Sequence, residues 1–281
     1  MKDLGHLRYF LGLEVAYGPR GYLLSQQKYI YNLLARAELT NDQIADTPLQ
    51  LHQKLAPDIG KLLENPTRYR EIVGALVYLT ISRLDIAYVV HVVSQFVQSP
   101  TTVHYVVVLS ILHYLRGTLS RALLFSSTSK LQRRAFSDSD WADDIIDCRS
   151  INGFCVFLGD TIISWRAKKQ HVVSKSSTEV EYRAMSTATS EIIWLRQLLC
   201  DMTIDCLSPT PLYYDSQSTI KIATNVVFHE HTKHIEIDSH FIRHHYSKTK
   251  AIFLSYISSE LQLADFFIKV HTSKRHKFLL S

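Results

Sequence analysis

Residues 136–141 read FSDSDW, and Asp138 follows the apolar Phe136 near the end of a predicted strand. Three more acidic segments follow in order: STEVEY (177–182) around Glu181, LYYDSQ (212–217) around Asp215, and QLAD (262–265) ending at Asp265. Each acid falls at a strand end or on a helix face. Their order along the chain is the one that an Asp-Glu-Asp-Asp metal site on one α/β sheet needs. Two divalent cations about 3.5–4 Å apart need several oxygen ligands, which carboxylates supply together with neutralising charge. The pattern therefore predicts metal-assisted phosphodiester cleavage.

The segments around these acids alternate between strand and helix patterns. Ser176, Ser177 and Thr178 offer an N-cap to a long helix that runs to about Met202. Gly159-Asp160 is typical of a hairpin turn. The remaining elements are predicted as strands at Arg133–Asp138, Gly153–Leu158, Ile162–Arg166, Pro209–Tyr214 and Ala251–Ile257, and helices at Ser216–Thr224, Ile235–His245 and Leu261–Phe278.

The first 121 residues have a different pattern, with few strands and several apolar helices. Strands are predicted at 7–16 and 21–25, a polar connection at 41–66, and helices at Gln26–Ala37, Tyr69–Thr80, Leu84–Gln95 and Val103–Leu115. We expect these helices to pack as a bundle. Its predicted core includes Leu76, Leu79, Ile86, Val90 and Val93.

Charge placement indicates a polyanionic partner more clearly than the net charge of +5 does. No acid occurs between Asp160 and Glu179, whereas four cations do: Arg166, Lys168, Lys169 and Lys175. Four cations beside four carboxylates suit a phosphate backbone that crosses a metal site. The alternative interpretation is a solvated basic turn.

Cysteine usage and the apolar runs indicate an intracellular protein, cytoplasmic or nuclear. The four cysteines form no CxxC pair and lie in or near apolar runs, which predicts buried free thiols in a reducing compartment. Asp3 and Arg8 interrupt any signal-peptide core, and no apolar run approaches the length of a membrane span.

The sequence resembles the C-terminal part of copia-type LTR-retrotransposon Pol polyproteins. The strings that resemble the family's ribonuclease H domain are FSDSDWADD (136–144), RSINGFCVFLGDTIISWRAKKQ (149–170), SKSSTEVEYRAMS (174–186), SEIIWLRQLL (190–199), LYYDSQSTIKIA (212–223), HTKHIEIDSHFIRHH (231–245) and QLADFFIK (262–269). Those that resemble the end of its reverse transcriptase are MKDLGHLRYFLGLEV (1–15), GYLLSQQKYIYNLL (21–34), YREIVGALVYLTISRLDIAYVV (69–90) and ILHYLRGT (111–118).

The resemblance implies an α/β ribonuclease H-like fold, with a mixed five-stranded sheet and flanking helices, after an α+β remnant and a helical thumb- or connection-like region. It implies domains at 1–48 (tail of the palm and start of the thumb), 49–128 (helical region) and 129–281 (ribonuclease H-like). The implied reaction is hydrolysis of the RNA strand of RNA–DNA hybrids with two Mg²⁺ ions, or Mn²⁺ in their place. Asp138, Glu181, Asp215 and Asp265 inherit the catalytic and metal-binding roles, and His234 joins the four cations at the nucleic acid.

Two acids near the site leave alternatives open. Glu181 shares a helix face with the apolar Ala184 and Met185, which favours it over Glu179, a capping or solvated acid on this interpretation. Asp140 lies two residues beyond Asp138, on the same face of the strand, and is either an alternative ligand or a residue that supports a ligand.

Several departures from the family bear on activity. The aromatic-x-Asp-Asp polymerase sequence is missing, and the resemblance places the palm and fingers upstream, so we expect no polymerase activity. Asp143-Asp144 lies in the wrong block to replace that sequence, and Asp143 stands where the family has a turn glycine. Residues 266–270 also differ from the family pattern. The alternative function is therefore a catalytically inactive nucleic-acid-binding remnant of a decayed retrotransposon.

Overall fold

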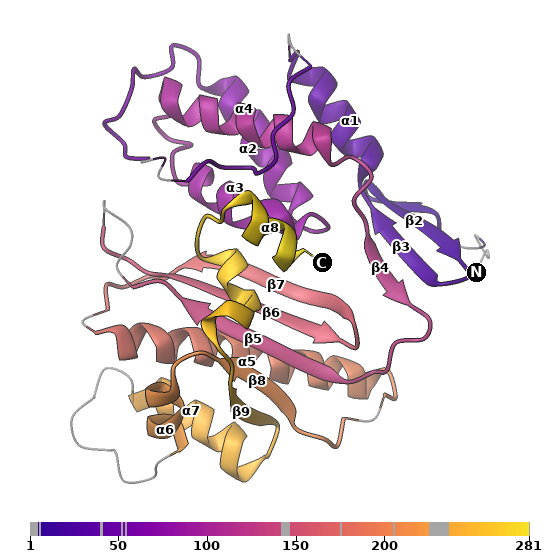
Figure 1. Ribbon diagram of the computed structural model, residues 1–281, viewed down its shortest axis with the longest axis vertical. Coiled ribbons are helices and arrows are strands. Elements are labelled where there is room, and N and C mark those ends of the chain that lie inside the picture. Colours follow the sequence, from indigo (N-terminus) through magenta and orange to yellow (C-terminus); the bar gives the residue numbers. More distant parts are fainter. Residues whose placement is uncertain are drawn as a thin grey trace. The chain divides into compact units, whose positions relative to one another are not determined.

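The computed structural model describes residues 5, 7–39, 42–51, 53, 55–141, 147–174, 176–204, 206–224 and 236–280. The chain forms two compact units (Figure 1). Unit 1 comprises Met1–Ser129 and Val270–Ser281, and unit 2 comprises Lys130–Lys269. The domain limits at 48 and 128 remain predictions, but residues 270–281, assigned by sequence to the ribonuclease H-like domain, group with unit 1.

Unit 2 is built on a mixed five-stranded sheet of order β7-β6-β5-β8-β9. Its strands are β5 (Arg133–Ser139), β6 (Ile151–Leu158), β7 (Thr161–Lys169), β8 (Thr210–Tyr214) and β9 (Ile252–Tyr256). The first three are antiparallel neighbours, whereas β8 runs parallel to β5 and β9 runs parallel to β8. This order and these directions confirm the predicted α/β, ribonuclease H-like fold class.

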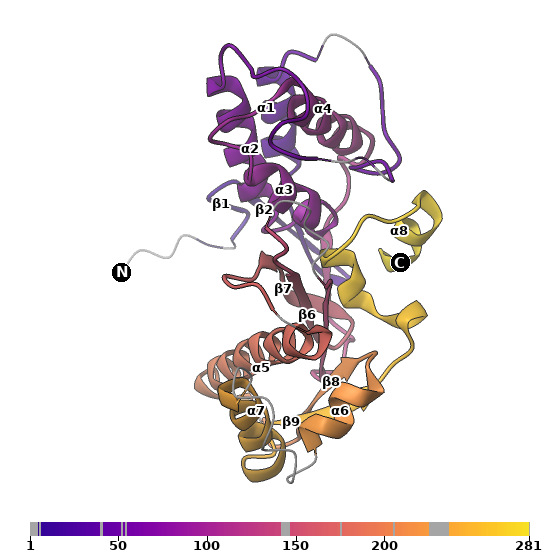
Figure 2. The same cartoon turned by 90° about the vertical axis from the view of Figure 1, so that its left-hand side faces the viewer.

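Helices and a short 3₁₀ segment cover the two faces of this sheet. The long helix α5 (Ser177–Asp201) begins at Ser176, whose side chain accepts a hydrogen bond from the Glu179 backbone N–H, as the N-cap prediction requires. Figure 2 shows α5 and α7 (Glu236–Arg243) on one side of the strands, with the 3₁₀ helix η5 (Leu263–Phe267) on the other. Helix α6 (Gln217–Thr224) follows β8, and a π-helical turn, η3 (His244–Lys248), continues α7. The apolar core of unit 2 lies between α5 and the sheet.

The predicted single helix Leu261–Phe278 is wrong. The structure has a 3₁₀ turn η4 (Ser259–Leu261), then η5, and after a break the helix α8 (Ser273–Leu279), so Asp265 lies in a 3₁₀ helix. Gln262 explains why no continuous helix starts at Leu261, because its extended backbone separates η4 from η5 and its side chain is bonded to other segments. Its Nε2 donates to the Ser137 carbonyl at 3.0 Å, and its Oε1 accepts from the Ala264 N–H at 3.2 Å.

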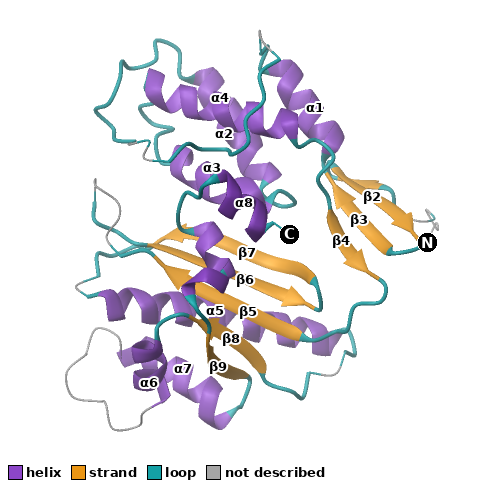
Figure 3. Ribbon diagram, in the orientation of Figure 1, coloured by secondary structure: helices purple, strands orange, loops and turns teal. Residues whose placement is uncertain are grey.

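Unit 1 combines a four-stranded antiparallel sheet with a group of helices (Figure 3). The sheet order is β1 (Tyr9–Phe10), β2 (Leu13–Gly18), β3 (Gly21–Ser25) and β4 (Leu123–Ser126). The predicted strand 7–16 is interrupted at Leu11 and Gly12, which both have positive φ. The helices are α1 (Gln27–Arg36), α2 (Thr67–Leu79), the 3₁₀ turn η1 (Leu84–Ile86), α3 (Ala87–Ser94), α4 (Thr102–Gly117) and α8. No helix of the described residues is both long and apolar enough to span a membrane.

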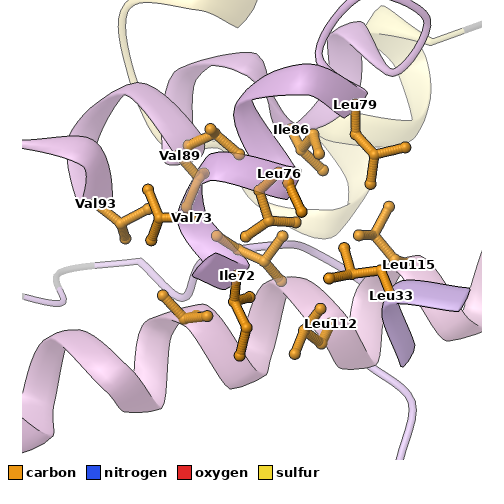
Figure 4. Close-up of a cluster of buried hydrophobic side chains, with 14 of the residues drawn as sticks. Leu33, Ile72, Val73, Leu76, Leu79, Ile86, Val89, Val93, Leu112 and Leu115 are labelled. Carbon is orange, nitrogen blue, oxygen red and sulfur yellow. The ribbon is translucent and has the colours of Figure 1, made fainter. Parts of the chain in front are cut away.

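The helices of unit 1 meet in one apolar core. In Figure 4 the labelled side chains of α1, α2, α3 and α4 point toward one another. The five predicted core residues of this region are all buried, which confirms the predicted bundle.

A buried ionic network lies beside that core. Arg83 and Asp85 form a bidentate pair at 2.9 and 2.7 Å, with side chains 2% and 3% exposed. Asp85 also accepts hydrogen bonds from Tyr114 at 2.7 Å and from Arg121 at 3.0 Å. Burial raises the pKa of Asp85, but the charge and hydrogen bonds of Arg83 more than compensate, so that the pKa falls to about 2. Tyr114 also contacts His276 at 2.9 Å, which connects α8 to α4 within unit 1.

Candidate active site

The register of the sheet brings two of the predicted acids to the same edge. Phe136 of β5 is paired with Tyr213 of the parallel strand β8. Asp138 and Asp215 each stand two residues beyond this pair, so they occupy matching positions at the carboxyl ends of adjacent strands. Adjacent strands are about 4.8 Å apart, which places the two backbones close together. Ligand sites are expected where such strand ends meet.

Asp265 approaches this edge from η5, which lies on the face of the sheet opposite α5 (Figure 2). Its side chain shares a hydrogen bond with Asp138, and both side chains are buried. Burial, the hydrogen bond with Asp265 and the charge of Asp215 together raise the pKa of Asp138 to about 9. Without a cation, burial and the neighbouring carboxyl groups therefore favour the protonated form of Asp138. The Lys269 ammonium pairs with Asp265 at 2.5 Å.

Glu181 approaches from the second turn of α5. Burial raises its pKa, as does the charge of Asp215, while a hydrogen bond with Ser216 acts in the opposite direction. Its carboxylate also accepts a hydrogen bond from the Thr219 hydroxyl of α6. Glu181 therefore lies within electrostatic range of Asp215 and is held by the segment that follows that residue.

The two alternative acids have other partners. Glu179 is buried and pairs with Arg183 at 2.7 Å, so its interpretation as a solvated acid was wrong. The Asp140 carboxylate accepts a hydrogen bond from the Ile151 backbone N–H, and the Asp140 N–H donates to the Ile151 carbonyl at 3.2 Å. Asp140 thereby extends the pairing of β5 with β6.

The four acids are gathered without forming a preformed ligand set. Among the residues that the structure describes, no three His, Cys, Asp or Glu side chains are arranged to hold a metal ion. The Asp138–Asp265 hydrogen bond occupies carboxyl oxygens that a cation would need. Assignment of the four acids as ligands remains a prediction.

Sequence reasoning missed two residues that place Asp265. Gln262 is fully buried and attaches η5 to β5 through the Ser137 carbonyl. Gly153 of β6 lies under η5, where an added Cβ would approach Ile268 Cγ2 to 2.7 Å, the Ala264 carbonyl oxygen to 2.9 Å and Phe267 Cβ to 3.0 Å. A glycine within the sequence of a strand is the signal of such a close approach.

We expect Gly153→Ala to lower the free energy of unfolding by about 1–3 kcal/mol, because the methyl group overpacks the contact between sheet and η5. Urea unfolding followed by circular dichroism measures this change. Gly74→Ala is the matched control, since an added Cβ at Gly74 of α2 meets nothing within 4 Å and alanine favours the helix. A Gly153→Ala variant as stable as the wild type would contradict the assigned packing.

The predicted nucleic-acid-binding cations lie partly on one strand. Arg166 and Lys168 of β7 are exposed and share a sheet face, where they line a hollow of about 300 Å³ together with Arg183 of α5. Lys169 is mostly buried and pairs with Asp147 at 2.9 Å. Lys175 and His234 lie outside the described residues, as do Asp143 and Asp144.

Sequence comparison supports these observations at the level of family. A search of protein-family models finds none that matches the chain. The chain is 41% identical over 265 residues to the "Retrovirus-related Pol polyprotein from transposon RE1" of Arabidopsis thaliana, a match that covers 94% of this chain and 18% of that protein. It is 35% identical over 254 residues to the corresponding polyprotein from transposon TNT 1-94 of Nicotiana tabacum, covering 86% of this chain and 19% of the relative.

Among solved structures, LC11-RNase H1 isolated from compost matches 54% of this chain and 99% of its own, at 14% identity. The TM-score of this match is 0.39. The strand order and strand directions define the fold of unit 2 as ribonuclease H-like. The chain belongs to the retrovirus-related Pol polyproteins of copia-type transposons and spans about a fifth of the length of the curated relatives above.

Proposed function

We propose that unit 2 is a ribonuclease H that hydrolyses the RNA strand of RNA–DNA hybrids. The observation that carries the proposal is the meeting of Asp138, Asp215 and Asp265 at one sheet edge. The strand register sets the first two beside each other, and a hydrogen bond joins Asp265 to Asp138. Glu181 is coupled to the same group through the charge of Asp215.

The chemistry of this donor set fits Mg²⁺, with Mn²⁺ as a substitute. Hard divalent cations prefer carboxylate oxygens. Burial and neighbouring carboxyl groups raise the pKa of Asp138 to about 9, and a nearby cation would stabilise the ionised form that they disfavour. Asp138, Glu181, Asp215 and Asp265 would hold two such ions, which would activate a water molecule and stabilise the leaving 3′-oxygen.

Other residues would orient these carboxylates. Ser259 donates a hydrogen bond to Asp215 at 2.7 Å, and Thr219 donates to Glu181. The ammonium of Lys269 offsets the charge of Asp265. Groups fixed before the substrate arrives need less reorganisation during the reaction.

The hybrid backbone would follow the carboxyl end of the sheet. Lys168 is paired with Asn152, which is paired with Ser139 of β5, so Lys168 lies two strand spacings, about 10 Å, from the strand that carries Asp138. Arg166 stands two residues away on the same face of β7. These cations would bind backbone phosphates, and contacts to the 2′-OH would identify the RNA strand.

A cleavage assay tests this function. The full chain is incubated with an RNA–DNA hybrid, a DNA duplex or an RNA duplex, with Mg²⁺ or with EDTA. We expect cleavage of the RNA strand of the hybrid and of neither duplex, in Mg²⁺ and not in EDTA. The products should end in 5′-phosphate and 3′-hydroxyl groups. Hybrid binding without cleavage in either Mg²⁺ or Mn²⁺ would instead establish the alternative, an inactive nucleic-acid-binding remnant.

Replacing both Arg166 and Lys168 with alanine is expected to weaken hybrid binding and to flatten its salt dependence by about 0.9 units of log–log slope for each phosphate that the variant no longer neutralises. Fluorescence anisotropy at several salt concentrations measures both quantities. The matched control replaces Lys130 and Lys248, exposed lysines that precede β5 and β9 at the opposite edge of the sheet. If the control variant changes the slope of the salt dependence as much as the Arg166 and Lys168 variant does, β7 is not the strand that binds the hybrid.

A further inference from the structure

A pair of cysteines lies at the end of α5 remote from the acids. Cys200 occupies the last turn of α5 and is exposed, whereas Cys206 follows in the segment leading to β8 and is buried. Cys206 lies within electrostatic range of Cys200, and both side chains line one hollow at the end of α5, so the two thiols are neighbours. Sequence reasoning predicted four buried free thiols, but Cys148 and Cys200 are exposed.

The backbone after α5 explains why these cysteines meet. The Ile204 N–H donates to the Leu199 carbonyl at 2.9 Å, and the Thr203 N–H donates to the Cys200 carbonyl at 2.9 Å. Thr203 has a φ of 63°, so this pair of bonds is a Schellman motif with threonine in the position that glycine usually takes. The chain therefore leaves the helix axis at Thr203, three residues before Cys206.

Two guanidinium groups hold the Cys206 segment in place. Arg133 Nη1 donates to Cys206 Sγ at 2.8 Å, and its Nη2 donates to the Ser208 carbonyl at 2.9 Å. Arg196 of α5 donates to the Cys206 carbonyl oxygen and, at 2.7 Å, to that of Ser208. Burial and the hydrogen bond with Cys200 raise the pKa of Cys206, while the charges of Arg133 and Arg196 act in the opposite direction. The net shift of the Cys206 pKa is upward, so the two guanidinium groups hold the segment in place without favouring a Cys206 thiolate.

The thiol pair opens to solvent through a hollow. Cys200 and Cys206 both line a cavity of about 600 Å³, together with Arg196, Thr203 and His245. This volume admits a peroxide molecule or a small thiol. Cys200 is the exposed member of the pair, so it meets the oxidant first.

We propose that Cys200 and Cys206 form a reversible redox site, in which a peroxide converts the dithiol to a disulfide that ties the end of α5 to the segment before β8. The thiolate of Cys200 attacks hydrogen peroxide, which forms an S–O bond, breaks the O–O bond and releases hydroxide. The sulfur of Cys206 then attacks the resulting sulfenic acid, which forms the S–S bond, breaks the S–O bond and loses the Cys206 proton. Two thiols thereby lose two electrons and two protons, and one peroxide becomes two water molecules.

Peptide mapping of the full chain tests this site without reference to nuclease activity. The reduced protein is treated with one equivalent of hydrogen peroxide, blocked with N-ethylmaleimide, digested and analysed by mass spectrometry. We expect a peptide that links Cys200 to Cys206 and that dithiothreitol separates, while Cys148 is recovered as a free thiol. The internal reference is Cys148, because it is exposed like Cys200.

Three variants complete the experiment. Cys200→Ser is expected to leave Cys206 reduced, Cys206→Ser to leave a sulfenic acid at Cys200 that dimedone traps, and the matched control Cys148→Ser to form the link as the wild type does. A wild-type protein in which Cys200 ends as a sulfinic acid or an intermolecular disulfide while Cys206 stays reduced would overturn the proposal. Equal oxidation of Cys148 and Cys200 with no internal link would overturn it as well.

Discussion

Asp138→Asn is expected to reduce Mg²⁺-dependent hydrolysis of an RNA–DNA hybrid by orders of magnitude while leaving hybrid binding intact. Asparagine has nearly the same shape as a protonated aspartate, but it cannot supply the negative charge that a bound cation requires. Because the pKa of Asp138 is raised to about 9 without a cation, the variant should also fold as stably as the wild type. Loss of activity would then report on metal chemistry and not on unfolding.

Single-turnover hydrolysis, with hybrid binding measured on the same samples, checks this prediction. Asp140→Asn is the matched control, because an amide oxygen can still accept the hydrogen bond from the Ile151 N–H. We expect that variant to retain most of its activity. Equal losses at both positions would mean that Asp140 joins the site, and wild-type activity in Asp138→Asn would remove Asp138 from it.

Asp85→Ala is expected to destabilise unit 1 by about 3–5 kcal/mol, because it leaves the Arg83 guanidinium buried without its counter-charge. The substitution also removes the acceptor that Tyr114 and Arg121 share. A large effect of this kind is typical of a broken buried pair and says little about the net value of the intact pair.

Hydrogen exchange of the α4 backbone amides measures the stability of unit 1. Tryptophan fluorescence would report on unit 2 instead, because all three tryptophans (Trp141, Trp165 and Trp194) belong to unit 2. Glu38→Gln is the matched control, since it breaks the exposed Arg68–Glu38 pair, whose side chains are 45% and 77% accessible. Exposed pairs contribute about 0–1 kcal/mol. If both variants lower the free energy of unfolding by the same small amount, the buried Arg83–Asp85 pair does not stabilise unit 1 as its burial indicates.

Local patterns predicted much of unit 2. The short strand patterns at 133–138 and 209–214 predicted β5 and β8. Because ligand sites are expected where strand ends converge, the meeting of Asp138 and Asp215 could be expected from sequence. The N-cap at Ser176 was confirmed because capping depends only on neighbouring residues. The metal-binding roles themselves remain predictions.

Interactions between distant residues account for what the sequence could not predict. Strand β4 was missed because its partner β3 lies about a hundred residues earlier, and the segment LLFS contains no turn or alternation that would identify a strand. The final helix was wrong because Gln262 bonds to Ser137 across the sheet and Gly153 admits η5 at close range. The proximity of Cys200 and Cys206 likewise depends on an unusual threonine conformation at Thr203.

Anomalous diffraction from crystals of the full chain soaked in Mn²⁺ tests the central claim most directly. The account predicts two manganese peaks about 3.5–4 Å apart, ligated by Asp138, Glu181, Asp215 and Asp265, with the Asp138–Asp265 hydrogen bond broken. Manganese bound elsewhere, or no manganese among these four carboxylates at saturating concentration, would contradict it.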